Sequence, residues 1–234
     1  MFEKQNRRDA QARVYRLIGL AHLHKGEHDE AHHALTHSLQ IAQEEQLPND
    51  QLLATEGLGD LYGQMGLPDK AASHYRSALA LAEAQGEKIV TGSILSRLGM
   101  VYVAQKKLSD AIGCFERALV LARDVGNLRA EANLLGQLGV CYQLAADWPA
   151  ARDAYQKAVD AVRDTGDLLS LAGLLGNLGT AYTQEGRYND ALRVTQEAQQ
   201  LFAHLDMDDL AEQAQAQIDR LHVAMGDDTG QDGL

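Results

Sequence analysis

A single spacing of 40 residues organises most of the sequence. One glycine recurs at that interval in five copies without an insertion, at Gly19, Gly59, Gly99, Gly139 and Gly179. An alanine follows each glycine by twelve residues, at Ala31, Ala71, Ala111, Ala151 and Ala191. A fixed period of this length is typical of a solenoid, in which each copy packs only against its neighbours.

Each copy has the residue pattern of two helices. An aliphatic residue precedes the glycine, and a tyrosine follows it by three residues in all copies but the first, which places these positions on one side of a first helix. The alanine starts a similar stripe on a second helix. Its next member, sixteen residues after the glycine, is Leu35, Tyr75, Phe115, Tyr155 or Thr195. We expect small residues where helices cross and large ones in the wider gaps.

The pattern Leu–Gly–x–x–Tyr, then Ala, an aromatic residue and Ala, resembles the tetratricopeptide repeat. The period is longer than the family's usual length of about 34 residues. It is similar to the long-helix repeats of kinesin light chains, spindle-orientation G-protein regulators and bacterial peptide-sensing regulators. The family's early Trp and late Pro are absent. The resemblance implies an all-α fold, a right-handed α-solenoid of five helix-turn-helix repeats with a C-terminal capping helix.

The repeats predict one solenoid domain over residues 1–225. We expect the copies at about 12–47, 52–87, 92–127, 132–167 and 172–206. Residues 208–225 are predicted to be the capping helix, because one face is apolar and the others are polar. The tail, 226–234, is polar and glycine-rich and is expected to be disordered.

Composition excludes several classes of function. The net charge of −12 and the lack of a basic block disfavour nucleic-acid binding. No apolar run reaches the roughly 18 residues of a membrane span, and the first residues do not form a secretory signal. Two cysteines, Cys114 and Cys141, are expected to be buried thiols. We therefore expect a cytoplasmic protein that binds neither membrane nor nucleic acid.

No set of residues predicts catalysis or a cofactor, so the chain is not expected to be an enzyme. The histidines are nevertheless unevenly placed, since six of nine lie in the first copy, at His22, His24, His28, His32, His33 and His37. His33 and His37 have a spacing that can hold a metal. Because the pattern fixes no third ligand, we predict no metal site. A metal-binding protein or metal-dependent enzyme is the least favoured hypothesis.

The family resemblance implies a concave groove, lined by the first helices, that binds an extended peptide or a helix. Counted from the repeat glycine, offsets of −6, −3, +1 and +5 form the lining stripe, and −2 and +4 flank it. The predicted groove residues are Glu56, Asp60, Gln64, Ser93, Ser96, Arg97, Met100, Asn133, Gly136, Gln137, Val140, Gln143, Gly173, Gly176, Asn177, Thr180 and Gln184. In the similar families, an Asn at the offset shared by Arg97, Gln137 and Asn177 commonly binds peptide backbone.

Three of these groove residues are glycines inside a predicted helix, where glycine costs about 1 kcal/mol relative to alanine. Two explanations fit Gly136, Gly173 and Gly176 equally well: close packing of helices, or space for the backbone of a ligand. The sequence leaves both explanations open.

The first helix is apolar around most of its circumference, through Val14, Tyr15, Leu17, Ile18, Leu20, Ala21 and Leu23. We predict that this end is covered by a second copy of the chain or by another protein; an apolar groove floor is the alternative. The leading hypothesis is a non-enzymatic scaffold that binds a segment of a protein partner. The alternative is a regulatory or sensor module whose curvature changes on ligand binding.

Overall fold

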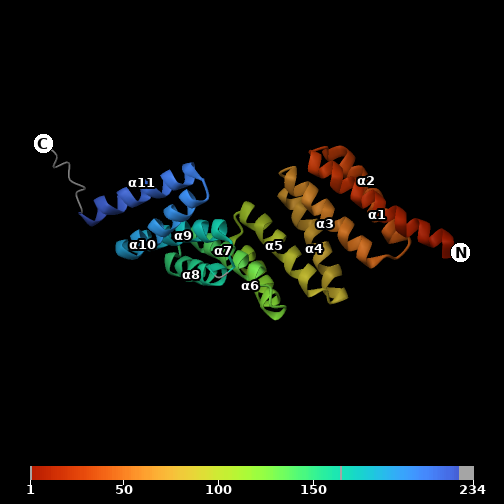
Figure 1. Cartoon of the computed structure of the whole chain (residues 1–234). Coiled ribbons are helices and arrows are strands. Elements are labelled where there is room, and N and C mark those ends of the chain that lie inside the picture. Colours follow the sequence, from red (N-terminus) through yellow and green to blue (C-terminus); the bar gives the residue numbers. More distant parts are fainter. Residues whose placement is uncertain (1, 164, 227–234) are drawn as a thin grey trace. The chain divides into compact units, whose positions relative to one another are not determined.

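The computed structural model describes residues 2–163 and 165–226. Helices follow one another through this part of the chain, with no strand among its residues (Figure 1). They are α1 (Phe2–Lys25), α2 (His28–Glu44), α3 (Pro48–Gln64), α4 (Pro68–Gln85), α5 (Lys88–Ala104), α6 (Leu108–Asp124), α7 (Leu128–Leu144), α8 (Trp148–Arg163), α9 (Leu168–Gln184), α10 (Tyr188–His204) and α11 (Asp208–Met225).

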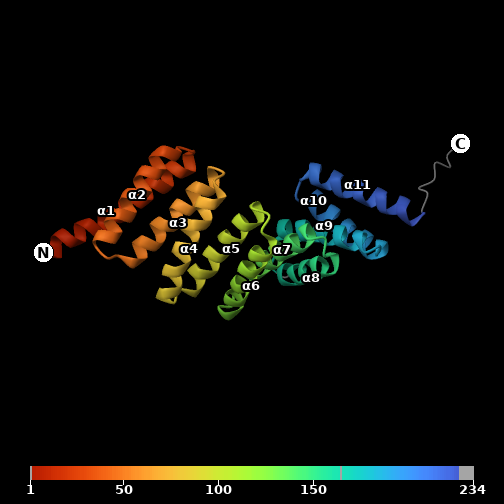
Figure 2. The ribbon, with the colours of Figure 1, turned by 180° about the vertical axis from the view of Figure 1, so that it is seen from behind.

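The helices pack in chain order within two compact units, residues 1–121 and 122–234. In the first unit α1 contacts α2, α2 contacts α3, α3 contacts α4 and α4 contacts α5. In the second unit consecutive helices from α7 to α11 contact one another in the same way (Figure 1, Figure 2). This packing confirms an all-α repeat solenoid that ends in a capping helix. One continuous domain over 1–225 stays a prediction. Of the tail predicted to be disordered, residues 227–234 lie outside the described part.

The turns depend on residues with a left-handed backbone. Gly26, Gly66 and Gly186 end the first helices of their copies with φ between +68° and +76°. The equivalent residues in the third and fourth copies are Lys106 and Ala146, with φ of 60° and 58°. A side chain is disfavoured there, so the turn geometry is kept by the surrounding packing even where the sequence lacks the glycine that would predict it.

The repeat glycine and the residue sixteen positions later form one packing unit. A Cβ atom added to Gly99 would lie 2.6 Å from Cε1 of Phe115, and one added to Gly139 would lie 2.5 Å from Cε1 of Tyr155. Both aromatic side chains are fully buried. The first helix therefore requires glycine so that the ring on the second helix can lie against its backbone.

The fifth copy departs from this arrangement because it carries Thr195 at the aromatic position. Thr195 is fully buried, and its Oγ1 has no hydrogen-bond partner among the described residues. A buried hydroxyl without a partner costs about 1–3 kcal/mol. Threonine in place of the aromatic residue therefore lowers the stability of the packing beside Gly179.

We expect Thr195→Val to raise the free energy of unfolding by about 1 kcal/mol, because valine has the shape of threonine without the unsatisfied hydroxyl. Urea unfolding followed by circular dichroism measures the change. Thr195→Ser is the control: it keeps the hydroxyl and loses a methyl group, so it should be less stable than the wild type. A valine variant no more stable than the wild type would mean that Oγ1 is already satisfied.

Candidate functional site

A cavity of about 700 Å³ lies in the first unit, between residues of α1, α3, α4 and α5. Four predicted groove residues line it: Asp60, Gln64, Arg97 and Met100. The remaining lining residues are Leu20, Leu23, His24, Gly63, Gly66, Pro68, Tyr75, Val101 and Ala104. Apolar side chains from α1 and α5 thus face a small charged group, which is the composition of most ligand pockets.

The charged group is centred on Arg97. Its Nη1 lies 2.5 Å from Oδ1 of Asp60, and its Nε lies 3.3 Å from Oε1 of Glu56. Burial opposes the charge on Arg97, but Asp60 and Glu56 outweigh that effect and raise its pKa. The stripe predicted from the sequence therefore brings two acids on α3 and one base on α5 into a single ion-pair network.

Tyr75 connects this network to the core. It is buried on α4, and its hydroxyl donates a hydrogen bond of 2.5 Å to Oδ1 of Asp60. Burial and this hydrogen bond to Asp60 both raise the pKa of Tyr75, so its hydroxyl remains a donor. The sequence assigned Tyr75 to packing alone, whereas the structure gives it a second role as a support for a groove carboxylate.

The carboxyl group of Glu56 lies in surroundings that disfavour its ionised form. Its side chain is 16% exposed, and burial raises its pKa even though Arg97 acts in the opposite direction. A charged group that the fold disfavours is a common property of functional sites. Glu56 does not itself line the cavity, and its contact with a ligand stays a prediction.

We expect Glu56→Gln to raise the melting temperature at neutral pH, because the raised pKa means that folding disfavours the ionised carboxyl. The destabilisation is present above the folded-state pKa and disappears below the unfolded value of about 4.5. The advantage of the variant should therefore shrink as the pH is lowered from 7 to 4. Thermal unfolding across this range tests the sign. An advantage that grows on acidification would contradict the assignment.

The other groove residues of the first unit lie outside the charged network. Ser93 is exposed and Ser96 is half-buried on α5, two turns and one turn before Met100. Neither residue lines the cavity. The predicted stripe is thus accessible along α5, while the hollow is confined to its C-terminal half.

In the second unit three of the ten predicted residues line two smaller cavities. Thr180 and Gln184 line one of about 270 Å³ together with residues of α11. Asn133 lines another of about 360 Å³ near the turn between α8 and α9. Val140 is half-buried, and Gln143 accepts a hydrogen bond of 3.0 Å from the hydroxyl of Tyr155. The capping helix is therefore part of this surface, which the sequence-based prediction did not include.

The three helix-interior glycines have different surroundings. A Cβ on Gly136 would lie 3.1 Å from Cδ2 of Leu174, whereas one on Gly173 or Gly176 would meet no atom within 4 Å. Close packing therefore accounts for Gly136 alone. Gly173 and Gly176 leave open space on α9, where packing gives no reason for glycine.

The shared offset of Arg97, Gln137 and Asn177 does not form a uniform ladder. Arg97 is committed to its two carboxylates, as described above. Gln137 is half-buried on α7, and Asn177 is exposed on α9. The side chain of Asn177 makes no hydrogen bond to another described residue, so its amide is available to a ligand.

The histidines of the first copy interact with different partners. Nδ1 of His22 lies 2.5 Å from Oε2 of Glu27, while Nε2 of His32 lies 3.1 Å from the hydroxyl of Tyr62. The rings of His33 and His37 are stacked, with centroids 6.4 Å apart. Within residues 2–163 and 165–226, no three His, Cys, Asp or Glu side chains are grouped so that they could hold a metal ion.

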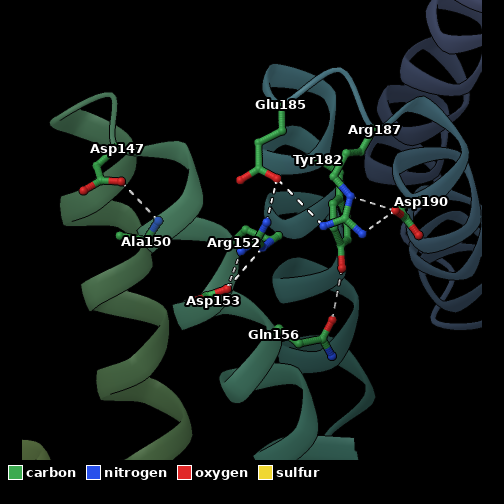
Figure 3. Close-up of polar contacts among 9 residues, drawn as sticks. All are labelled: Asp147, Ala150, Arg152, Asp153, Gln156, Tyr182, Glu185, Arg187 and Asp190. Carbon is green, nitrogen blue, oxygen red and sulfur yellow. Dashed lines mark hydrogen bonds and ion pairs between the residues drawn. The ribbon is translucent and has the colours of Figure 1, made fainter.

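A polar network in the second unit joins the fourth and fifth copies (Figure 3). Arg152 on α8 lies 2.8 Å from Oε2 of Glu185, in the turn after α9, and Arg187 binds Asp190 while its guanidinium covers the ring of Tyr182. All of these acids are ion-paired, so the network fastens α8 to the α9–α10 turn. Sequence reasoning missed it because no repeat position predicts which side chains meet.

The repeat architecture is matched by known families. Two family models, both described as tetratricopeptide repeat, match this chain, one at residues 8–84 and 90–164 and the other at 174–201. These matches cover more than half of the sequence, and the helix pairs of the structure fit them. The chain belongs to the tetratricopeptide repeat family.

Solved structures share the fold at low sequence identity. BtubC (BKLC) from P. vanneervenii is 22% identical, with a TM-score of 0.78 over 88% of this chain and 85% of that one. Tetratricopeptide-like repeats of a putative kinesin light chain from P. anserina are 15% identical, with a TM-score of 0.72 over 84% and 97%. A signal transduction ATPase with a tetratricopeptide repeat sensor from Pyrococcus horikoshii is 16% identical, with a TM-score of 0.79 over 91% of this chain and 32% of that one.

Two further findings concern curated relatives and membrane spans. No curated protein matches the sequence significantly. Among the described residues, no helix has the length and apolar character that crossing a membrane requires.

Proposed function

We propose that this protein is a non-enzymatic scaffold that binds a segment of a partner protein, and that the cavity in the first unit is its principal binding site. The observation that carries the proposal is the hollow formed by α1, α3 and α5, which combines apolar walls with the network of Arg97, Asp60 and Glu56. Members of this repeat family typically mediate protein–protein interactions, and four residues of the predicted stripe, Asp60, Gln64, Arg97 and Met100, line the hollow.

The arrangement suits an apolar side chain presented on a peptide. Leu20, Leu23 and Met100 provide surface for that side chain. Asp60 and Gln64 provide oxygens that can accept hydrogen bonds from peptide N–H groups. Because Arg97 and Tyr75 already hold Asp60, its carboxylate is fixed before a ligand arrives, which reduces the entropy lost on binding.

Filling the cavity tests the proposal. Gly63 lines it, and a Cβ there would meet no atom within 4 Å. We expect Gly63→Leu to abolish the capture of partners from a native lysate, as identified by mass spectrometry, while the protein stays folded. Gly113→Leu is the matched control, because Gly113 lies on α6 outside the cavity and is equally open. Identical partners for both variants and the wild type would refute the assignment of this cavity.

The exposed part of α9 is proposed as an extension of the binding surface. Gly176→Arg fills the open space beside Asn177 and raises helix propensity, so lost binding cannot be attributed to a weakened helix. We expect this variant to lose partners that contact the second unit. Full retention of every partner would confine the site to the cavity of the first unit.

A further inference from the structure

An uncovered apolar strip runs along α1. Val14, Leu17 and Ile18 are 52%, 57% and 41% exposed, and Ala21 beside them is also exposed. These four residues are called the α1 strip below. Their spacings of three and four residues place them on one face of the helix. No described helix of the chain covers this face, and α1 is the first helix of its unit (Figure 1).

The same repeat positions are covered by a helix in later copies. Ile18 is equivalent to Leu58 and Leu98, which are each 3% exposed. Those residues lie on α3 and α5, which pack against α2 and α4, the second helices of the preceding copies. The α1 strip therefore has the residue pattern of a surface on which this fold places a helix, and no helix of the described residues lies on it.

The last described helix, α11, has a polar face where earlier copies have core residues. On α11 the position of the repeat glycine is Asp219, and Gln215 stands where the three preceding copies have leucine. Both residues are exposed. Among the described helices, α11 thus has polar residues at positions that are buried in earlier copies, whereas α1 keeps apolar ones. This difference indicates that the α1 strip is normally covered.

Charge around the strip favours an acidic occupant. Arg7, Arg13 and Lys25 are exposed. None has a described carboxylate within ion-pair distance, although Lys25 is close enough to Glu27 to lower the pKa of that carboxyl. Arg7 and Lys25 lie seven residues before Val14 and seven after Ile18, which puts them at the two ends of the same face. The only acid between residues 7 and 25 is Asp9, whose Oδ1 is buried. This basic edge contrasts with the net charge of −12 of the chain.

We propose that the α1 strip binds an acidic amphipathic helix of another protein, in the place that a preceding repeat's second helix would occupy. A second copy of the chain fits less well, because two α1 helices packed together would bring their cations close to one another. The face of α1 that contains the strip is about 27 Å long from Arg7 to Lys25. One helix face of that length is much smaller than the roughly 1,200–2,000 Å² of a stable dimer interface. Binding should therefore be moderate and strongly salt-dependent.

A probe can be taken from the chain itself. The helix α4 covers the equivalent face of α5, so a synthetic peptide of residues 68–85 has a suitable apolar stripe. An acidic probe carries Lys70→Glu and Arg76→Glu, and its matched basic probe carries Asp69→Lys and Glu83→Lys. We expect the full-length protein to bind the acidic probe at least tenfold more tightly at low salt, measured by fluorescence anisotropy. The difference should disappear at high salt.

Variants of the protein locate the site. Leu17→Glu should reduce binding of the acidic probe at least tenfold, whereas Val223→Glu, the same kind of change at an exposed residue of α11, should leave it unchanged. Gly63→Leu should also bind the probe normally, which separates this strip from the cavity. Circular dichroism confirms that each variant is folded.

Three results would overturn the proposal. The first is equal affinity for the acidic and basic probes, or binding that survives Leu17→Glu. The second is a dimer in analytical ultracentrifugation that Leu17→Glu dissociates, which would make a second copy the occupant. The third is binding to phosphatidylserine-containing vesicles that Leu17→Glu abolishes, which would assign the strip to a lipid surface.

Discussion

Gly139→Ala is expected to lower the free energy of unfolding of the second unit by about 2–3 kcal/mol. The added methyl group would lie 2.5 Å from Cε1 and 2.6 Å from Cδ1 of Tyr155. That ring is fully buried and cannot swing aside without displacing its neighbours. Alanine would otherwise favour the helix by up to about 1 kcal/mol, so the loss is a net effect of the clash. Urea unfolding monitored by circular dichroism provides the measurement.

Gly173→Ala is the matched control for this prediction. Gly173 is also inside a first helix, but a Cβ there would meet no atom within 4 Å. Helix propensity then acts alone, and we expect the variant to be more stable than the wild type by up to about 1 kcal/mol. If the two alanine variants changed stability in the same direction, contact with the aromatic ring would not be the reason for the repeat glycine.

The two glycines also show how far the sequence determines the fold. The 40-residue period was sufficient to predict the helix pairs and their packing in chain order, because the glycine position and the position sixteen residues later recur at the same spacing in each copy. The period could not distinguish a glycine that is packed from one that is open. That distinction depends on Leu174, which reaches Gly136 but neither Gly173 nor Gly176.

The turns were predictable only in part. Gly66 and Gly186 mark the ends of their helices in the sequence, but Lys106 and Ala146 adopt the same left-handed backbone without any residue signal. At these positions the packed hairpin on either side decides the backbone, and local preference is overridden. A prediction from residue type alone is weakest where tertiary contacts decide the conformation.

For the candidate site, the sequence pattern indicates positions along one helix but not contacts between helices. Asp60 and Arg97 belong to the predicted stripe, and the structure joins them in an ion pair. Leu20 was omitted because the prediction began the groove at the second copy, and Tyr75 because its aromatic ring was assigned to the core. Both residues line the cavity, and a stripe counted on the first helices of the second to fifth copies includes neither of them.

The network at the α9–α10 turn shows the same limit. Arg152 and Glu185 are on different elements, and their contact depends on the conformations of two long side chains (Figure 3). No periodic signal encodes such a pair, since the equivalent positions in other copies hold different residues. A network of this kind must therefore be observed in the structure.

Tyr155→Ala is expected to lower the free energy of unfolding by about 3–5 kcal/mol, the range found when a large aromatic side chain is removed from a core. Tyr155 is fully buried, and its hydroxyl donates to Oε1 of Gln143 at 3.0 Å. Burial raises the pKa of Tyr155 to about 12, so the hydroxyl remains protonated. Tyr155→Phe removes only the hydrogen bond and should cost about 1 kcal/mol. A comparable loss in both variants would show that the hydroxyl, and not the ring, dominates.

Combining Tyr155→Ala with Gly139→Ala tests the packing unit directly. Once the ring is absent, the methyl group introduced by the glycine substitution has space, so Gly139→Ala should no longer destabilise and should slightly stabilise α7. The double-mutant cycle should therefore give a coupling free energy of about 2–3 kcal/mol, close to the full cost of the single glycine substitution. Additive losses would mean that the two residues contribute independently. In that case, their constant separation of sixteen residues would reflect the helix geometry of the repeat instead of direct contact between glycine and ring.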